Sequence, residues 1–251
     1  MKNINSKKND SRYLKQFLRD KCLPLLAEKH TYFNIRDIRA CLALNGWKTC
    51  PATLKIYLSE LASEPFIYHA GKGWYTFVKT HFILDKEPVE ELIKLLKNEY
   101  PLLKFSCWST AQIRSYAHHL LNRFVHFVYV ESDAIPSVAE FLRDKGYDVW
   151  KNPRGLTAKE FSIREKTVVI RRTLNRQPGE DFFSPIEKIL VDLFAENRSI
   201  PLTELEEYSR IFRNIAERER LSMGALLSYA RERKLKKTDF EKTMLYTISA
   251  F

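Results

Sequence analysis

The sequence predicts an α+β protein in which an N-terminal helical domain with a β-hairpin precedes a mixed α/β domain that ends in a helical extension. A length of 251 residues exceeds the usual span of one small domain. In the N-terminal quarter, apolar residues recur at the spacing of a helix. In later segments the spacing alternates between that of a strand and that of a helix. We therefore expect one domain over residues 1–80 and a second over 81–251, with an α/β core over 81–183 and a helical extension over 184–251.

The composition is typical of a folded, soluble protein. Apolar residues make up 45% and charged residues 29% of the chain. No apolar run approaches the roughly 20 residues that cross a bilayer, and the start, MKNINSKKNDSRYLK, lacks a signal-peptide core. We expect a cytoplasmic protein without a membrane partner. Its cysteines fall in segments that bury or half-bury them, as reduced core residues: Cys22, Cys41, Cys50 and Cys107.

The positive charge of the chain is concentrated near its N-terminus. Of a net charge of +11, residues 1–80 carry +8, from 14 Lys and Arg against 6 Asp and Glu. Residues 81–180 carry +3, and residues 181–251 carry no net charge. Such a field attracts phosphate backbones or anionic lipid. Surplus lysine for solubility is the alternative that charge alone leaves open.

Two helices are predicted before residue 46. The first covers residues 12–28, and Pro24 should kink or end it. After a short extended stretch, Asn34 and Asp37 have the spacing of a capping box that starts a second helix. Asn45-Gly46 is typical of a helix end.

A third helix is predicted to start at Pro51, because a capping hydroxyl and a first-turn proline precede the apolar pattern. Three leucines at i, i+4 and i+7 should pin it to the first two helices: Leu54, Leu58 and Leu61. The side chains left outside suit phosphate oxygens and base edges: Thr53, Lys55, Ile56, Tyr57 and Ser59.

A β-hairpin follows the third helix. Residues 66–69 and 74–78 are aromatic and β-branched strand segments around the tip Gly71-Lys72-Gly73. The tip offers a cation on flexible backbone. The order helix, helix, turn, helix, hairpin is that of a winged helix-turn-helix, so we expect this domain to bind double-stranded DNA. Winged helices also serve as protein-docking modules, which is the alternative.

If DNA is the ligand, the third helix enters the major groove and the hairpin lies on the neighbouring backbone. The expected groove contacts are Thr49, Thr53, Lys55 and Ser59. The expected phosphate contacts are Lys48, Lys72 and Lys79.

The rest of the sequence predicts strands and helices that alternate, and then helices alone. The expected strands cover 79–85, 103–108, 124–130, 146–150, 161–164 and 166–171. The expected helices cover 88–98, 109–121, 134–144, 201–212 and 223–233, with one more from Ser184. We interpret the charged runs 213–220 and 231–237 as solvated faces, with a nucleic-acid or partner surface as the alternative for the second.

The sequence offers no clear catalytic or metal site. The Glu232-x-Lys234 step lies on a predicted helix, whereas restriction-type nucleases carry such a step on a strand. His118 and His119 are adjacent on a predicted helix and face different ways, so they do not suit one metal ion. Ser109 and His118 could act as a nucleophile and its base, but a serine that begins a helix is ordinarily the helix cap. No glycine pattern cradles a phosphate. We expect a protein that is not an enzyme and needs no metal or cofactor, with a nuclease-like second domain as an alternative.

Two stretches resemble a known family. FSCWSTAQIRSYAHHLLNRFVHFVYVE and SPIEKILVDLFAE, behind a winged helix, are similar to the AbiEi-like antitoxins of bacterial abortive-infection systems, a type IV toxin-antitoxin family. The resemblance implies an autorepressor that binds inverted repeats and counteracts a nucleotidyltransferase-like toxin. A homodimer would suit such repeats, although no heptad seam is evident. The long helical tail after residue 184 departs from the family pattern.

Overall fold

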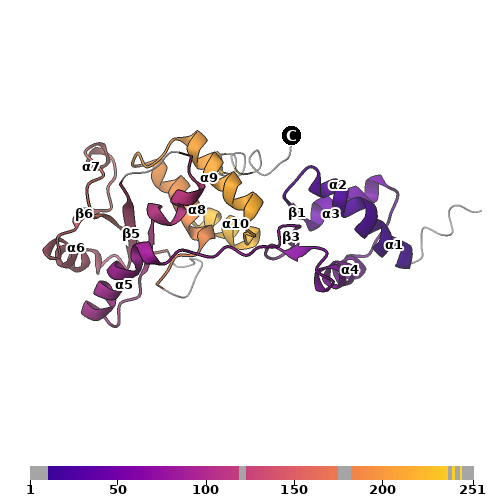
Figure 1. Ribbon diagram of the computed structural model, residues 1–251, viewed down its shortest axis with the longest axis horizontal. Helices are drawn as coiled ribbons and strands as arrows, with labels where there is room; N and C mark the ends of the chain where they lie inside the picture. The colour runs from indigo at the N-terminus through magenta and orange to yellow at the C-terminus, as the bar shows by residue number, and fades with distance from the viewer. Residues whose placement is uncertain (1–10, 119–122, 175–181, 237–238, 241–243, 245–251) are drawn as a thin grey trace, which may run out of the picture. The chain divides into compact units, whose positions relative to one another are not determined.

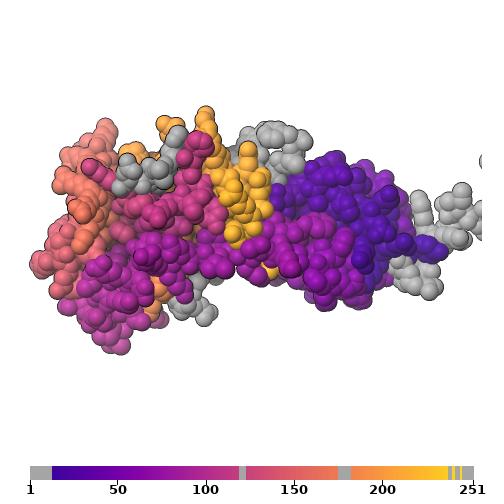
Figure 2. Space-filling view, viewed as in Figure 1, coloured from indigo at the N-terminus to yellow at the C-terminus, as the bar shows by residue number. Residues whose placement is uncertain are grey.

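The computed structural model describes residues 11–118, 123–174, 182–236, 239–240 and 244. They form two compact units (Figures 1 and 2). The first comprises the described residues up to His81 together with Ile215–Gly224, and the second comprises Phe82–Asn214 and Ala225–Met244. Each unit combines helices with one β-sheet, so the protein belongs to the α+β class. The division at residue 80 into independently folding domains stays a prediction.

The first helical segment contains a π-helical turn. Helix α1 (Ser11–Phe17) continues through η2 (Leu18–Cys22) into α2 (Leu23–Ala27). Pro24 lies in the first turn of α2. Because proline lacks an N–H and its ring crowds the preceding turn, a wider π turn just before it accommodates it without ending the segment.

Helix α3 (Ile35–Leu44) begins with the predicted capping box. The Asn34 side chain accepts hydrogen bonds from the backbone N–H groups of Arg36 at 2.8 Å and Asp37 at 3.3 Å. Asp37 Oδ2 accepts one from the Asn34 N–H at 2.7 Å. The helix ends at Asn45, and Gly46 follows with a φ of 76°. Both predicted boundaries are confirmed.

Helix α4 (Pro51–Ser63) starts where the sequence places it. The predicted capping hydroxyl is wrong, because the residue before the helix is Cys50 and the Thr49 hydroxyl donates to the Cys50 carbonyl at 3.2 Å. Cys50 is exposed, against the expectation that every cysteine would be buried or half-buried. The three predicted leucines are fully buried in the core that α4 shares with the preceding helices: Leu54, Leu58 and Leu61.

The predicted hairpin forms, with shorter strands than expected, within a three-stranded antiparallel sheet. Strand β3 (Trp74–Thr76) lies between β1 (Tyr32–Asn34) and β2 (Tyr68–His69). The turn between β2 and β3 contains Gly71 and Gly73, whose φ angles of 93° and 75° suit glycine.

A segment from far along the chain, Ile215–Gly224, completes the first unit. The Tyr32 hydroxyl accepts a hydrogen bond from the Leu221 N–H at 3.1 Å and donates toward the carbonyl oxygens of Ala216 and Glu219, at 3.0 and 2.9 Å. The Arg220 guanidinium lies 4.8 Å from the centre of the Tyr68 ring. The sequence did not predict this segment as part of the N-terminal unit.

The second unit is built on a four-stranded mixed sheet in the order β4-β5-β7-β6. Strand β4 (Ser106–Ser109) is antiparallel to β5 (Val125–Val130). Strand β7 (Thr167–Arg172) is parallel to both β5 and β6 (Asp148–Lys151). These four strands confirm the mixed sheet that the alternating pattern predicted.

Helices cover both faces of this sheet. On one face, α5 (Glu87–Glu99) and α6 (Ile135–Asp144) pack on alternate strand residues such as Val128 and Ile170. On the other face, α8 (Ile186–Asn197) meets Tyr129 and Arg171, so it forms a layer of this unit (Figure 1). The remaining helical elements are η3 (Thr110–Tyr116), α7 (Leu156–Lys159), α9 (Leu205–Arg218) and α10 (Met223–Glu232).

Three sequence predictions for the second unit are wrong. Residues 161–164 form no strand, because Arg164 N–H donates to the Thr167 hydroxyl at 2.7 Å and closes a turn. The described residues 79–85 also form no strand. Ser109 does cap a helix, but this is the short 3₁₀ helix η3, and residues 119–122 of the expected helix lie outside the described residues.

No helix among the described residues combines the length and the apolar character needed to span a membrane.

Candidate nucleic-acid interface

The seven predicted DNA-contacting residues lie in four places in the first unit. Lys48 and Thr49 lie in the turn between α3 and α4. Lys72 occupies the turn between β2 and β3, and Lys79 follows β3. Helix α4 carries the other three: Thr53, Lys55 and Ser59.

Helix α4 brings only some of these side chains together. At 3.6 residues per turn, Ile56, at 56% exposure, points away from the buried leucines, and Ser59 and Lys55 follow it toward one flank of the helix, where both are exposed. Thr53 lies on the opposite flank beside Tyr57, and both are half-buried. The exposed face of α4 therefore presents Lys55 and Ser59 but not Thr53.

The exposed face of α4 keeps its positive charge. Glu60 lies on this helix and Glu64 directly follows it, but Lys15 Nζ pairs with both carboxylates, at 2.9 and 2.7 Å, and Arg19 pairs with Glu64 at 3.4 Å. The Lys15 ammonium lowers the pKa of the Glu64 carboxyl through its hydrogen bond. The described acidic side chains form no ion pair with any of the four predicted lysines, all of them exposed: Lys48, Lys55, Lys72 and Lys79.

Cys50, which the sequence analysis assigned to the core, lies at the N-terminal end of the same helix. Hydrogen bonds from the backbone N–H groups of Ala52 and Thr53 lower the pKa of its thiol. These N–H groups belong to the first turn of α4, where helix geometry leaves them without helical acceptors. The start of α4 thus favours negative charge close to Lys48 and Thr49.

One side of the hairpin tip packs against a distant segment that the sequence did not predict there. A Cβ atom built on Gly71 would lie 2.7 Å from the backbone nitrogen of Gly224 and 2.9 Å from the Ser222 hydroxyl. The backbone of Gly71 therefore packs directly on residues 222–224, and the expected flexibility of the tip stays a prediction. The Lys72 side chain next to it remains exposed.

The residues considered for catalysis have structural partners. The Ser109 hydroxyl accepts a hydrogen bond from Ala111 N–H at 3.2 Å, which makes it the cap of η3. The His118 N–H donates to the Glu207 carboxylate at 2.6 Å, and His119 lies outside the described residues. Within the part of the chain that the structure describes, no three His, Cys, Asp or Glu side chains gather as metal ligands.

The second unit contains a buried ionic network that the sequence analysis missed. Lys188 Nζ lies 2.6 Å from Asp192 Oδ2, and both side chains are fully buried on α8. Asp192 Oδ1 lies 3.2 Å from Arg233 Nε and accepts a hydrogen bond from the Tyr229 hydroxyl at 2.8 Å. Arg233 Nη2 donates to Glu196 Oε1 at 2.8 Å.

The network continues from α8 to the sheet. Arg171 Nε donates to Glu196 Oε2 at 2.8 Å, and its Nη2 contacts the same oxygen. Arg171 Nη1 also donates to Asn152 Oδ1 at 3.1 Å and to the Pro153 carbonyl at 3.0 Å. Thus Arg233, which the sequence placed on a solvated face, points into the unit.

The spacing of the charged residues in SPIEKILVDLFAE could have revealed this network. Lys188, Asp192 and Glu196 follow one another at intervals of four and therefore share one side of α8. Charged residues at that spacing are ordinarily exposed. Here the helix is apolar on its other sides as well, which is typical of a helix buried all round.

These elements define an α+β protein with a small basic first unit and a second unit in which helices cover both faces of a mixed sheet. The chain belongs to DUF6577, a family of unknown function, whose model matches residues 53–249. The match begins within α4 and includes the β2–β3 hairpin and all of the second unit. Comparison with curated proteins gives no match. Membership in this family assigns no activity, so function must be argued from the surfaces of the molecule.

Proposed function

We propose that the first unit is a winged helix-turn-helix and binds double-stranded DNA. The observation that carries the proposal is the outward face of α4, where Lys55 is exposed and forms no ion pair with the described acidic side chains. The order α3, turn, α4 and hairpin, with β1 beside β3, supports the proposal because a winged helix has the same order of elements.

In the proposed complex, α4 lies in the major groove. Lys55 and Ser59 reach base edges from its exposed side, because a lysine donates to guanine acceptors and a serine hydroxyl pairs with either kind of group. Lys48 and the N–H groups at the start of α4 contact one phosphate strand, and Lys72 contacts phosphates from the hairpin. Thr53 contributes at the flank of the helix.

The test is duplex binding as a function of salt. Fluorescence anisotropy with a labelled fragment of the gene's own upstream region should give an affinity that falls with salt. In Lys55→Ala/Lys72→Ala the slope of log K against log[salt] should flatten by about one unit for each phosphate that the variant no longer neutralises. Lys21→Ala/Lys29→Ala is the matched control, because it removes two exposed lysines elsewhere in the unit and should leave the slope unchanged.

The outcomes of this experiment separate the alternatives. If both double variants give the same slope of log K against log[salt], α4 and the hairpin do not form the interface. An absence of duplex binding at low salt would favour the protein-docking function of a winged helix. Cleavage of the fragment in the presence of Mg²⁺ would favour a nuclease.

We further propose that the protein is an autorepressor and the antitoxin of an AbiE-like system. The resemblance of the β4–β5 segment and of α8 to such antitoxins supports this role. The expected operator contains inverted repeats and is bound by two copies of the chain. Co-expression should restore growth to cells that produce a nucleotidyltransferase-like toxin of an AbiE-like system. Continued growth arrest, with both proteins present in soluble form, would contradict the antitoxin role.

A further inference from the structure

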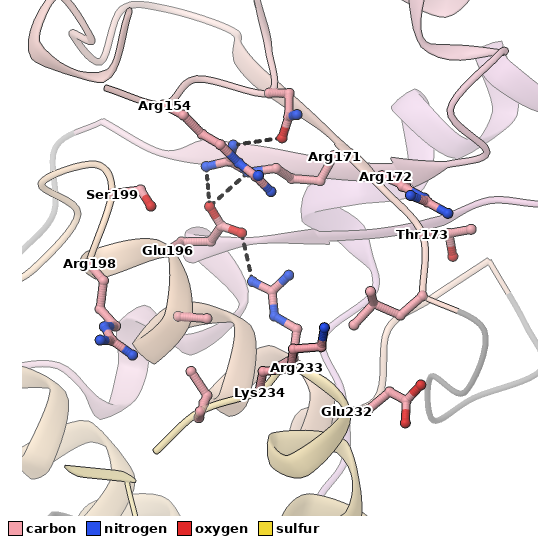
Figure 3. Close-up of a pocket in the computed structure, with 14 residues that line it drawn as sticks. Arg154, Arg171, Arg172, Thr173, Glu196, Arg198, Ser199, Glu232, Arg233 and Lys234 are labelled. Carbon is pink, nitrogen blue, oxygen red and sulfur yellow. Dashed lines mark hydrogen bonds and ion pairs between the residues drawn. The ribbon is translucent and has the colours of Figure 1, made fainter. Parts of the chain in front are cut away.

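The second unit contains a cavity of about 560 Å³ at one end of its sheet, lined by residues at or just after the C-terminal ends of β6, β7, α8 and α10 (Figure 3). Six basic side chains line it: Arg154, Arg171, Arg172, Arg198, Arg233 and Lys234. Its acidic lining consists of Glu196 and Glu232. Ser199 and Thr173 add hydroxyl groups. The cavity is thus strongly positive.

The acidic residue at its centre is already neutralised. Figure 3 shows the Glu196 carboxylate between the guanidinium groups of Arg171 and Arg233, and hydrogen bonds join it to both. Arg154, Arg172 and Arg198 have no side-chain partner among the described residues, and all three are exposed. Their charges are therefore available to a ligand.

The buried network behind the cavity also carries a net positive charge. Its cations are Lys188, Arg171 and Arg233, and its anions are Asp192 and Glu196. Arg233 is 15% exposed, and the other four side chains are no more than 5% exposed. Buried charges are costly unless they are paired, so one positive charge in this network lacks a counter-ion among the described residues.

The protein groups around Lys188 only partly compensate for this charge. Its ammonium lies 3.4 Å from the centre of the Tyr129 ring, a cation–π contact. The Tyr129 hydroxyl is buried and has no hydrogen-bond partner among the described residues. The network opens toward the cavity at Arg171 and Arg233, where an anion could approach it.

We propose that this cavity binds a small molecule that carries two or more phosphate groups. Guanidinium groups bind phosphate oxygens in a bidentate manner, and several arginines around one site suit a multiply charged phosphate better than a single carboxylate. The volume lies within the range of about 300–1,000 Å³ that is typical of small-molecule sites. The bound anion supplies the counter-charge that the network lacks.

The test is isothermal titration calorimetry of the full-length protein at constant ionic strength. One arm uses tripolyphosphate and the second arm uses ATP. Saturable binding of tripolyphosphate is expected. Arg154→Gln/Arg198→Gln should weaken it at least tenfold, because two guanidinium groups no longer pair with phosphate oxygens. Lys104→Gln/Arg164→Gln removes two exposed charges of the same unit outside the cavity lining and should change the affinity less than twofold. Arg172→Gln is a second cavity variant, should the first fail to fold.

The two arms distinguish the sources of phosphate. Equal affinity for tripolyphosphate and ATP would identify a free oligophosphate, and tighter binding of ATP would identify a nucleoside phosphate. No saturable binding at millimolar concentration, or equal weakening in cavity and control variants, would overturn the proposal. So would a cavity variant that loses duplex DNA affinity but binds tripolyphosphate as before. The DNA variants lie in the other unit, so the two proposals fail separately.

Discussion

Lys188 is a fully buried cation on α8. Burial lowers the pKa of its ammonium, and Asp192 opposes that effect by its charge and its hydrogen bond. Burial also lowers the pKa of Arg233, but the charges of Asp192 and other neighbours raise it more, so this guanidinium stays charged. The two cations depend on Asp192 in different ways. Lys188 forms a hydrogen bond to one carboxylate oxygen, and Arg233 lies beside the other.

Removing Lys188 alone should therefore be costly. We expect Lys188→Met to lower the free energy of unfolding by about 1–3 kcal/mol, because Asp192 loses its closest hydrogen-bond partner while Arg233 and Tyr229 still contact its other oxygen. Lys94→Met is the matched control: Lys94 pairs with Glu90 at 3.1 Å at the same spacing, but both are exposed, and the expected cost is below about 1 kcal/mol. Similar losses in urea unfolding of the two variants would contradict this view of the network.

His126 on β5 should make stability depend on pH. Burial lowers its pKa, and Glu91 partly opposes that effect. Its Nδ1 is buried without a described hydrogen-bond partner. The folded protein favours the neutral imidazole. The stability that comes from this preference is therefore complete above the ordinary histidine pKa of about 6.5 and is lost as the pH falls below that value. Urea unfolding between about pH 7.5 and 5.5 should show a steeper loss in the native protein than in His126→Gln. Identical slopes would exclude His126 as the cause.

At the scale of the element, the hairpin is shaped by its contact with residues 222–224. Gly71 and Gly73 both need a positive φ, yet they differ in their surroundings. A Cβ on Gly71 would meet backbone at 2.7 Å, whereas a Cβ on Gly73 would have no neighbour within 4 Å among the described residues. The pair therefore separates the cost of the backbone conformation from the cost of the contact.

We expect Gly73→Ala to cost about 1–2 kcal/mol of stability, which is the strain of a side chain at positive φ. Gly71→Ala should cost that much and about 1–3 kcal/mol more, because the new methyl group must displace packed backbone. Thermal unfolding measures both costs. Amide hydrogen exchange at residues 68–76 should accelerate more in Gly71→Ala. Equal effects of the two substitutions would show that residues 222–224 yield without cost.

The elements that sequence patterns predicted well are those fixed by local interactions. The Asn34–Asp37 box and the leucines of α4 act within a few residues, so their spacing is enough to reveal them. The strand expected at 161–164 failed because a local turn and the lack of a pairing strand in the described part of the chain outweigh its alternating pattern. Phe161 and Ile163 alternate as in a strand, but the backbone of Arg164 bonds to Thr167, and no strand among the described residues pairs with this segment.

The candidate DNA site was predictable to a similar extent. The sequence identifies Lys55 and Lys72 as outward cations, and both are exposed. It treats Thr53 and Lys55 alike as outward residues, but helical geometry puts them on opposite flanks of α4, and Thr53 is half-buried. The buried position of Arg233 and the role of Ile215–Gly224 depend on contacts between distant segments, which no periodic pattern encodes.

At the scale of the whole molecule, the first unit is not contiguous in sequence. Tyr32 makes its three hydroxyl contacts with residues 216, 219 and 221. We expect Tyr32→Phe to lower the stability of the full-length protein by about 1–3 kcal/mol, because buried backbone groups lose their partner. In a fragment of residues 1–81 the same substitution should have no such effect, and the fragment should melt at a lower temperature than the full-length protein.

Circular dichroism melts of the four proteins measure this difference. If Tyr32→Phe destabilises the fragment and the full chain equally, the Tyr32 hydroxyl stabilises the unit through the N-terminal residues alone. A fragment too unstable to melt cooperatively agrees with the expectation, since residues 215–224 are then required for the unit to fold.

The distance in sequence between Tyr32 and its partners has a consequence for biosynthesis. A ribosome releases β1 and the hairpin long before it translates residues 215–224, so Tyr32 and Gly71 can contact Leu221 and Gly224 only late in translation. Translation that stops before residue 224 therefore yields a polypeptide whose first unit is incomplete.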